Sequence, residues 1–259
     1  MNYVITYGGG LGDIIDQIFR NRPKYNSLMN LKRKDRCIIG LICHNPAVTE
    51  IWENHPKKDK LDIRNPGYCW PPGRLGLPAD KFPPLGNNDP IQVYPHEKDK
   101  EILNNLPEKY LVMNCGAGMV ERSYPQEIVD DIVRQLDGWT LYGIGKNYIR
   151  NERIADIRYP RPVIDLVDKL SVPGCMSLIQ RCRGLITAHS AGHCIGNHYQ
   201  PWQLLLYPQS VKDKYPYWSG KVGHIYSHAL FENYKTALDQ FIEKIKVRNI
   251  PDGERNGIN

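Results

Sequence analysis

Residues 184–208, GLITAHSAGHCIGNHYQPWQLLLYP, form the stretch of sequence that decides the fold. Residues 184–188 are an apolar run of strand length, residues 189–198 turn into a helix at small side chains, and residues 202–207 form a second apolar strand. Strands that alternate with helices in this way form parallel sheets with helices on both faces. The stretch therefore predicts an α/β protein.

The same alternation continues on both sides of this stretch. We expect strands at 110–115 and 139–144, an amphipathic helix at 126–136, a helix that closes at 177–183, and a long amphipathic helix at 230–247. Together these elements predict one doubly wound unit, which extends from residue 108 to residue 259.

The N-terminal part of the chain opens in the same manner but is less regular. Residues 3–7 predict a strand that enters a glycine turn and a helix, and residues 37–43 predict a second strand followed by a short helix. Much of the proline lies in residues 64–95, which we interpret as a long loop with at most one strand, at 91–94. The order favours a separate, reduced Rossmann-like domain at residues 1–107 over one continuous sheet.

The composition is that of an ordinary soluble globular protein. Of the 259 residues, 41% are hydrophobic and 24% charged, and no apolar run approaches the roughly 20 residues that span a bilayer. The N-terminus lacks the basic and apolar regions of a secretion signal. The seven cysteines include no CxxC pair, which indicates reduced thiols rather than a disulfide framework. These features predict a cytoplasmic protein without a transmembrane segment.

The formal net charge of +6 favours anionic partners, which include a nucleotide-sugar, a phosphorylated glycan and nucleic acid. The charge does not choose among these partners, because the basic residues are scattered along the chain. Two clusters, at residues 31–36 and 55–60, are equally well explained as solvated loop charge.

The glycine turn at residues 8–12 matches neither of the common phosphate-binding motifs. A P-loop requires a lysine that the turn lacks, and in a GxGxxG motif counted from Gly8 the third glycine is replaced by Asp13. A carboxylate at a helix start is stabilised by about 0.3–1 kcal/mol through the helix dipole, and neighbouring glycines leave it accessible. Asp13 is therefore a candidate general base for an acceptor hydroxyl. The alternative is that Asp13 only caps its helix.

A second candidate site lies where the helix after residue 188 begins. Ser190, Ala191 and Gly192 present backbone N–H groups and the positive end of the helix dipole, where an anion can bind. Arg122 could close the other side of a diphosphate. The turn at 143–146 follows a strand at the place where such folds hold a nucleoside, and its candidate residues are Gly143, Gly145 and Lys146. For Lys146, plain solvent exposure is the alternative.

The histidines do not form a recognisable metal site. His189 and His193 lack the glutamate of the HExxH zinc motif, and the sequence has no paired cysteines of the structural zinc type. The sequence also contains no Asp-x-Asp, so we expect no metal ion at the leaving group. A histidine that binds phosphate or sugar is the favoured interpretation, and a hydrogen-bonded core histidine is its competitor.

Three stretches, GGGLGDII at 8–15, GAGMVERSYPQE at 116–127 and ITAHSAGHCIGNHYQPWQLLLYP at 186–208, resemble the heptosyltransferase family of glycosyltransferases. This resemblance implies the GT-B architecture, in which two Rossmann-like domains with parallel sheets face one another across a cleft. It implies an acceptor-side domain at residues 1–107 and a nucleotide-sugar-binding domain at residues 108–259, which ends in the helix expected at 230–247.

The resemblance implies roles for particular residues. Asp13 occupies the place of the family's catalytic base. Arg122 replaces the motif lysine that meets the donor diphosphate, and Tyr124 replaces the motif tryptophan. The acceptor-side loop next to the base would consist of Gly10, Leu11 and Gly12.

The third motif departs from the family pattern D-[ST]-G-x-x-H. His189 replaces the acidic residue, and the spacing to the second histidine, His193, is one residue short. These departures put the identity of the donor in doubt. The donor-binding residues that the resemblance implies are Gly116, Ala117, Arg122, Gly143, Gly145, Lys146, Ser190, Ala191, Gly192 and His193.

The activity implied by the resemblance is inverting glycosyl transfer without a metal or other cofactor. Asp13 would deprotonate the acceptor hydroxyl, and the C-terminal domain would stabilise the leaving nucleoside diphosphate. The donor would be an ADP-, UDP- or GDP-linked sugar, and the acceptor a glycan. Two alternatives stay open: transfer to a hydroxylated base in DNA, and a non-catalytic nucleotide-binding module of the same fold, which the replacement at His189 favours.

Overall fold

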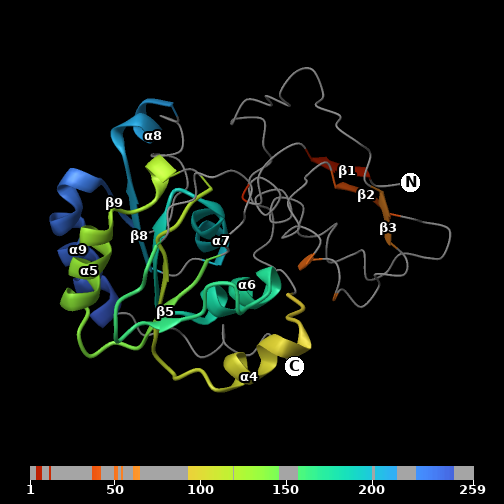
Figure 1. Cartoon of the computed structure of the whole chain (residues 1–259), viewed down its shortest axis with the longest axis horizontal. Helices are drawn as coiled ribbons and strands as arrows, with labels where there is room; N and C mark the ends of the chain where they lie inside the picture. Colours follow the sequence, from red (N-terminus) through yellow and green to blue (C-terminus); the bar gives the residue numbers. More distant parts are fainter. Residues whose placement is uncertain are drawn as a thin grey trace.

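The chain forms two separate parallel sheets in a computed structural model that describes residues 4–7, 12, 37–41, 50–51, 54, 61–64, 93–118, 120–145, 157–199, 202–214 and 226–247 (Figure 1). The smaller sheet consists of β1 (Val4–Tyr7), β2 (Cys37–Leu41) and β3 (Leu61–Arg64). Strand β2 lies in the middle and pairs in parallel with both neighbours. This arrangement agrees with a small parallel α/β unit in the N-terminal part of the chain.

The larger sheet has six strands, all parallel, in the order β6-β5-β4-β7-β8-β9. They are β4 (Leu111–Asn114), β5 (Leu141–Gly143), β6 (Ile164–Asp165), β7 (Gly184–Ala188), β8 (Trp202–Tyr207) and β9 (Tyr226–Leu230). Within this sheet, the first strand in the sequence is β4, in the middle. The chain then passes outward through β5 to β6, returns to β7 beside β4, and passes outward again through β8 to β9. This is the doubly wound strand order of Rossmann folds.

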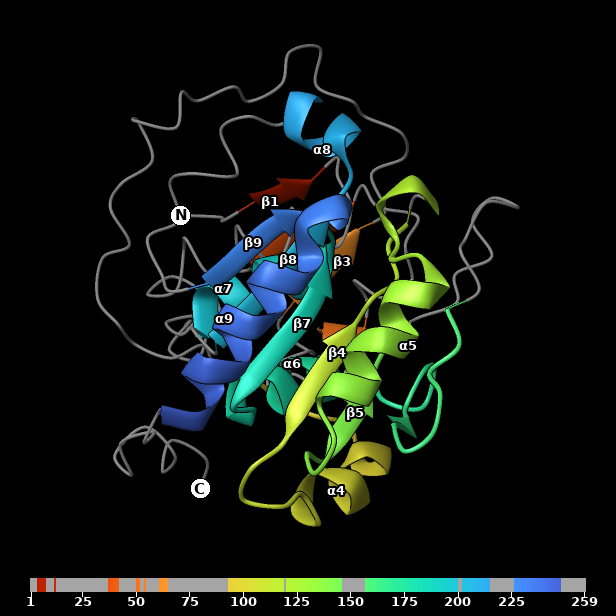
Figure 2. The same ribbon diagram turned by 90° about the vertical axis from the view of Figure 1, so that its left-hand side faces the viewer.

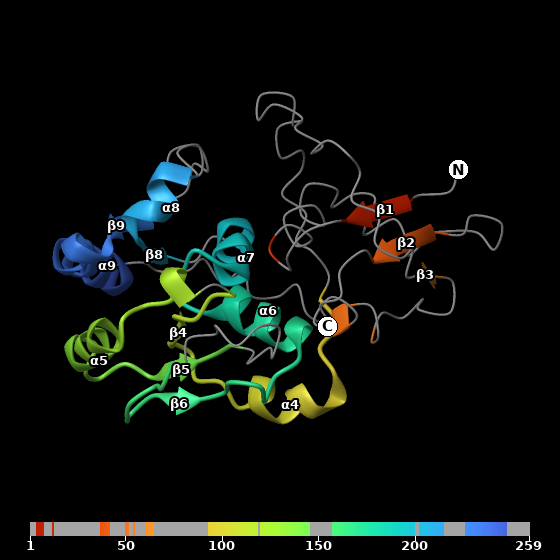
Figure 3. The same cartoon turned by 45° about the horizontal axis from the view of Figure 1, so that its top comes forward.

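Helices cover both faces of the six-stranded sheet (Figure 2, Figure 3). One face carries α5 (Gln126–Gln135) and α9 (Tyr234–Val247), and the other carries α6 (Val172–Arg181) and α7 (Ala191–Tyr199). In addition, α4 (Glu97–Asn104) packs against α6, and α8 (Gln209–Lys214) follows β8. Among the described residues, no helix is both long and apolar enough to cross a membrane.

The strands divide their side chains between two cores, because successive side chains of a strand point to opposite faces of the sheet. Leu111 and Met113 of β4 join the core beneath α5 and α9, whereas Val112 joins the core beneath α6 and α7. In β7, Leu185 and Ile186 divide in the same way. All five side chains are fully buried. Burial on both faces explains why these strands are continuous apolar runs in the sequence, and it makes their carboxyl ends a rigid platform.

The N-terminus of α6 is held by two carboxylates from distant parts of the chain. Asp99 of α4 is fully buried. Its carboxylate accepts hydrogen bonds from the hydroxyl of Ser171, from the backbone N–H of Ser171 at 2.9 Å, and from the backbone N–H of His96 at 2.8 Å. Glu50 accepts a hydrogen bond from the N–H of Val172 at 2.7 Å. The two carboxylates thus satisfy amides for which the helix has no acceptor. The second contact also ties residue 50 to the C-terminal unit.

Replacing Asp99 with Ala is expected to lower the free energy of unfolding by about 2–4 kcal/mol, because the N–H and the hydroxyl of Ser171 then lack an acceptor inside the core. Urea unfolding followed by circular dichroism measures the change. Glu97→Gln is the matched control on the same helix, since Glu97 is exposed and pairs with Lys100 at the surface. The control substitution should lower the free energy of unfolding by less than about 0.5 kcal/mol. An equally small loss for Asp99→Ala would show that α6 does not depend on this cap.

Several expected elements are confirmed, and the C-terminal helix is shorter than expected. Strands β7 and β8 and helix α5 lie where the sequence placed them. The helix expected at 230–247 instead begins at Tyr234, because β9 extends to Leu230 and the 3-10 helix η5 (Phe231–Asn233) intervenes. Pairing of β9 with β8, in which Leu230 lies beside Tyr207, outweighs the helical pattern of this segment.

Further elements also differ from the expectation. Strand β3 and helix α4 were not expected, because a four-residue strand and a helix rich in charged residues give little hydrophobic periodicity. The strand expected at 91–94 is wrong at residues 93 and 94, which are not in a strand. The carbonyls of Tyr94 and Pro95 instead accept hydrogen bonds from the side chain of Asn54.

Candidate functional site

The carboxyl edge of the six-stranded sheet has its topological switch point between β4 and β7, where the winding direction reverses. Open α/β sheets bind their ligands at this point, because the loops that leave the two strands run to opposite faces. The loop after β4 leads to the 3-10 helix η4 (Val120–Arg122), and the turn after β7 leads directly into α7. The predicted donor site lies in two sequence stretches, residues 116–127 and 186–208. The first follows β4 and the second includes the end of β7, so both lie at the strands that flank the switch point.

Helix α7 approaches the ends of the strands closely because two of its glycines face the sheet. A Cβ on Gly192 would lie 2.6 Å from Oδ1 of Asn114 and 2.9 Å from Oγ1 of Thr187. A Cβ on Gly196 would lie 2.5 Å from Cδ2 of Leu185. Residues four apart lie on the same side of a helix, so both glycines act together. A larger side chain at either position would push α7 away from the switch point.

Asn114, the last residue of β4, holds the turn that precedes α7. Its Oδ1 accepts a hydrogen bond from the hydroxyl of Ser190 at 2.9 Å, and its Nδ2 donates to the carbonyl of Ile144 at 3.3 Å. Among the residues that the structure describes, none accepts a hydrogen bond from the backbone N–H of Ala191 or Gly192. These amides lie at the positive end of the helix dipole, which makes them suitable for binding an anion.

Gly12 of the N-terminal glycine turn lies against the same end of α7. A Cβ on Gly12 would be 3.1 Å from Sγ of Cys194 and 3.4 Å from Cα of Ala191. A contact this close leaves little room for any residue larger than glycine. Gly12 and the start of α7, which the sequence places in different halves of the chain, therefore meet. Of the other residues predicted in this turn, Gly10, Leu11 and Asp13 lie outside the described residues.

Arg122, which is half-buried, is positioned by Tyr124, two residues further along the chain. The hydroxyl of Tyr124 donates to the carbonyl of Thr187 at 2.9 Å and accepts from the N–H of Leu206 at 3.1 Å. Burial raises the pKa of Tyr124 well above its usual value, so the phenol keeps its proton. Tyr124 thereby fastens the loop that carries Arg122 to the carboxyl ends of β7 and β8.

The loop between β4 and η4 is also held by hydrogen bonds between its own residues. The N–H of Ala117 donates to Oγ of Ser123 at 3.0 Å, and the N–H of Ser123 donates to the carbonyl of Val120 at 3.0 Å. A Cβ on Gly116 would make an ordinary contact, at 3.7 Å, with Ile157. The amide of Ala117 thus serves the loop, and contact of Gly116 and Ala117 with a donor stays a prediction.

His189, which lies two residues before the start of α7, is influenced by the positive charge of Arg122. Burial first, and then the positive charge of Arg122, lower the pKa of His189 from 6.5 to about 4. The ring of His193 lies 5.7 Å from the ring of His189, measured between centroids. His189 is therefore neutral at neutral pH in the unliganded protein, although it lies where an anion is expected to bind.

In the structure His193 has a packing role, and its predicted contact with the donor stays a prediction. Its Nδ1 lies 2.9 Å from Oε1 of Gln203, and its Nε2 lies 3.1 Å from Nδ2 of Asn197. Nε2 of Gln203 donates to Oδ1 of Asn197 at 3.3 Å, which closes a ring of three hydrogen bonds and assigns the imidazole proton to Nδ1. His193 is only 1% exposed. The competing interpretation, a hydrogen-bonded core histidine, fits because both ring nitrogens are already engaged.

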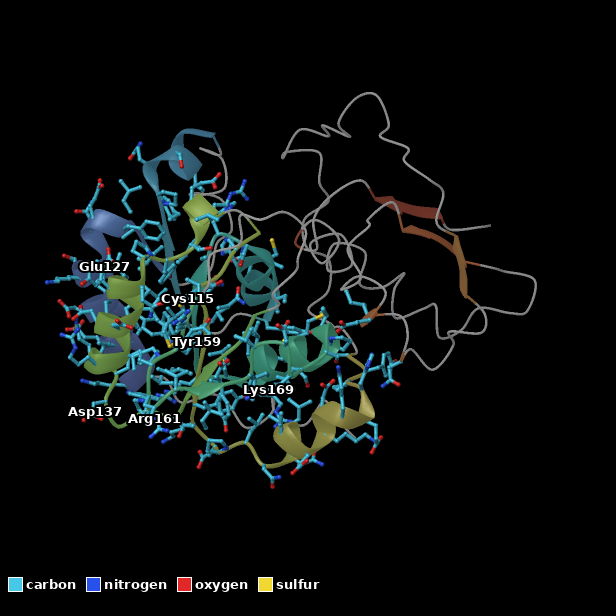
Figure 4. The ribbon with its side chains drawn as sticks, in the orientation of Figure 1. Cys115, Glu127, Asp137, Tyr159, Arg161 and Lys169 are labelled. Atoms are coloured by element: carbon cyan, nitrogen blue, oxygen red, sulfur yellow. The ribbon has the colours of Figure 1, made fainter. Side chains whose placement is uncertain are left out.

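Tyr159 covers Gly143 at the end of β5. A Cβ on Gly143 would lie 2.3 Å from Cδ2 of Tyr159. The tyrosine hydroxyl lies 3.0 Å from the carbonyl of Met113 and 3.1 Å from that of Ile144, and it accepts from the N–H of Cys115 at 3.1 Å. Figure 4 shows Tyr159 and Cys115 close together inside the fold. The absence of a side chain at Gly143 thus serves the packing of Tyr159, which joins the ends of β4 and β5.

The rest of the predicted nucleoside turn is only partly described. Gly145 extends the edge of β5, because its carbonyl accepts a hydrogen bond from the N–H of Asp168 at 3.0 Å. A Cβ on Gly145 would lie 3.8 Å from Val167, which is an ordinary contact. Lys146 lies outside the described residues. Binding of a nucleoside at this turn therefore stays a prediction.

Comparison with solved structures supports the fold. The chain is similar to ADP-heptose LPS heptosyltransferase II of E. coli, with 11% sequence identity, a TM-score of 0.50, and coverage of 95% of this chain and 99% of that chain. It is also similar to a family 9 glycosyl transferase of Veillonella parvula, with 15% identity, a TM-score of 0.50, and coverage of 97% and 90%. No protein-family model and no curated protein sequence matches the chain. The resemblance to heptosyltransferases inferred from the three sequence stretches is thus confirmed at the level of the fold.

Three residues that shape the site were not among those predicted from the sequence. Asn114 could have been found, because it is a polar residue that ends an apolar strand just before a glycine-rich loop. His189 was considered with His193 as a candidate for binding a metal, phosphate or sugar and was noted as a departure from the family motif, but it was not chosen as a donor-binding residue. Tyr159 follows no periodic pattern, and its role depends on its contact with Gly143.

Proposed function

We propose that this chain is a glycosyltransferase that moves a sugar from a nucleoside-diphosphate sugar to an acceptor hydroxyl, with inversion and without a metal ion. The observation that carries the proposal is the contact of Gly12 with the start of α7. We take this contact as support for one site that is formed by the glycine turn, with Asp13 as its base, and by the amides of Ala191 and Gly192. The fold shared with a heptosyltransferase described by its ADP-heptose substrate makes an ADP-linked sugar the first donor to test.

The proposed mechanism divides the charges between the two sides of this site. The donor diphosphate binds against the amides at the start of α7, and Arg122 stabilises the negative charge that grows on it as the glycosidic bond breaks. Asp13 takes the proton from the acceptor hydroxyl as its oxygen attacks the anomeric carbon from the opposite face of the sugar. One bond forms and one breaks at the same carbon, so a single displacement inverts its configuration.

A panel of ADP-, UDP- and GDP-linked sugars tests donor binding by thermal shift. A matching donor at about 100 times its Kd should stabilise the protein by about 2.7 kcal/mol and raise the Tm by about 5–10 °C. The sugars without their nucleoside diphosphate are the control and should leave the Tm unchanged. If no nucleotide-sugar raises the Tm, the proposed donor site is wrong.

A second measurement separates transfer from binding alone. Release of nucleoside diphosphate is followed with the matching donor and with oligosaccharide or hydroxymethylated duplex DNA as acceptor. Release that depends on the oligosaccharide supports the proposal, whereas release that depends on DNA, with binding strongly weakened by salt, supports transfer to DNA. A donor that binds tightly but is never turned over with either acceptor would support the non-catalytic module.

A further inference from the structure

We propose that His189 is a further donor-binding residue, which takes up a proton when the diphosphate binds and donates a hydrogen bond to a phosphate oxygen. This inference rests on the proposed function, since it adds a residue to the same donor site. It also couples the affinity for the donor to pH.

The backbone places His189 at the centre of the switch point. It is the first residue after β7 and lies two residues before the start of α7. The turn that holds it is fixed by the hydrogen bond from the hydroxyl of Ser190 to Asn114 and by the close approach of Gly192 to the same side chain. His189 is half-buried, so its position relative to the amides of α7 is set by the fold.

The groups around His189 explain why the proton arrives only with the ligand. Among the described residues, the charged group that acts on His189 is Arg122, from η4. The titratable group that packs against it from α7 is His193, whose ring is engaged by Gln203 and Asn197 in its neutral form. Burial and Arg122 both disfavour a positive charge on His189, and a diphosphate beside these residues would reverse the balance by supplying negative charge.

The direction of the pH effect follows from linkage. A ligand that binds the protonated form more tightly raises the pKa of that group, and its affinity increases as the pH falls. The pKa of free His189 is about 4. If the bound diphosphate restores the pKa to the ordinary value of about 6.5, the donor should bind about 20-fold more tightly at pH 5 than at pH 7.

The experiment uses ADP-glucose and UDP-glucose as probes, because their diphosphate diester has no group that titrates between pH 5 and 8. Isothermal titration calorimetry at pH 6, in two buffers of different ionisation enthalpy, gives the number of protons taken up. The wild-type protein should take up a substantial fraction of one proton per ligand. His189→Gln, which can still donate a hydrogen bond but cannot titrate, should take up none, and its affinity should become independent of pH within about twofold.

Two further measurements guard against trivial outcomes. His96→Gln is the matched control, because His96 lies at the start of α4, where it contacts the carbonyl of Glu50, and its substitution should leave proton uptake unchanged. NMR titration of the ligand-free protein tests the charge coupling without any activity: Arg122→Gln should raise the pKa of His189 above about 4.

The outcomes distinguish this inference from the proposed function. Binding of a probe without proton uptake, or proton uptake that persists in His189→Gln, overturns the role of His189 and leaves the donor site intact. Failure of both probes, and of every other nucleotide-sugar, to bind would overturn the donor site and this inference together.

Discussion

Replacing Asp13 with Asn is expected to lower kcat for sugar transfer by about 1,000-fold and to leave the donor Kd within about twofold of its wild-type value. Asn has the shape of Asp but cannot take a proton from the acceptor hydroxyl. In the proposed mechanism the donor is held by α7 and Arg122 and not by residue 13, so its affinity should not change. Initial rates of nucleoside diphosphate release and calorimetric donor binding measure the two quantities.

The contrast between the two effects makes this experiment informative. A general loss of folding would lower kcat and donor binding together, whereas loss of the base lowers kcat alone. Asp137→Asn is the matched control, because Asp137 is an exposed carboxylate after α5, and its rate should equal that of the wild type. An Asp13→Asn variant that keeps most of its turnover would assign deprotonation of the acceptor to another group and leave Asp13 as a helix cap.

The second large effect is expected at Arg122. Replacing it with Met should lower kcat/KM for the donor by about 100-fold, which corresponds to the loss of one or two charge-assisted hydrogen bonds to the diphosphate. Because the negative charge on the leaving group grows in the transition state, kcat should fall as well as the affinity for the donor. Steady-state kinetics with varied donor concentration measure both parameters.

Two companion variants give this result its meaning. Arg122→Lys keeps the charge but loses the planar fork of donors, so it should recover about tenfold of the lost kcat/KM. Arg134→Met is the matched control, because Arg134 is an exposed arginine of α5 that pairs with Asp131 at the surface. If Arg122→Met and Arg134→Met have equal kinetics, Arg122 does not meet the diphosphate.

Much of the C-terminal unit could be predicted because its strands are buried on both faces. The runs at 184–188 and 202–207 contain few polar residues, and the structure has β7 and β8 at these same positions. Strand β9 escaped prediction because its identity depends on pairing with β8. Helix α4 escaped because its buried charge, Asp99, finds its partners in distant residues such as Ser171.

The site was predicted less completely than the fold, because local residue types do not show which side chains are already engaged. The sequence presents His193 and His189 as similar residues in one short motif. In the structure, His193 is closed into a ring of hydrogen bonds with Gln203 and Asn197, whereas the positive charge of Arg122 acts on His189. The partners of both histidines come from other elements of the fold.

The sequence by itself determined the α/β class and the doubly wound C-terminal unit, because apolar periodicity and glycine turns are local properties of the chain. Only the tertiary structure decided that Gly12 meets the start of α7 and that His189 shares its surroundings with Arg122. Both join segments that lie far apart in the sequence. His189 and Arg122, for instance, follow β7 and β4, and the pairing of these two strands is a property of the whole sheet that no single segment encodes.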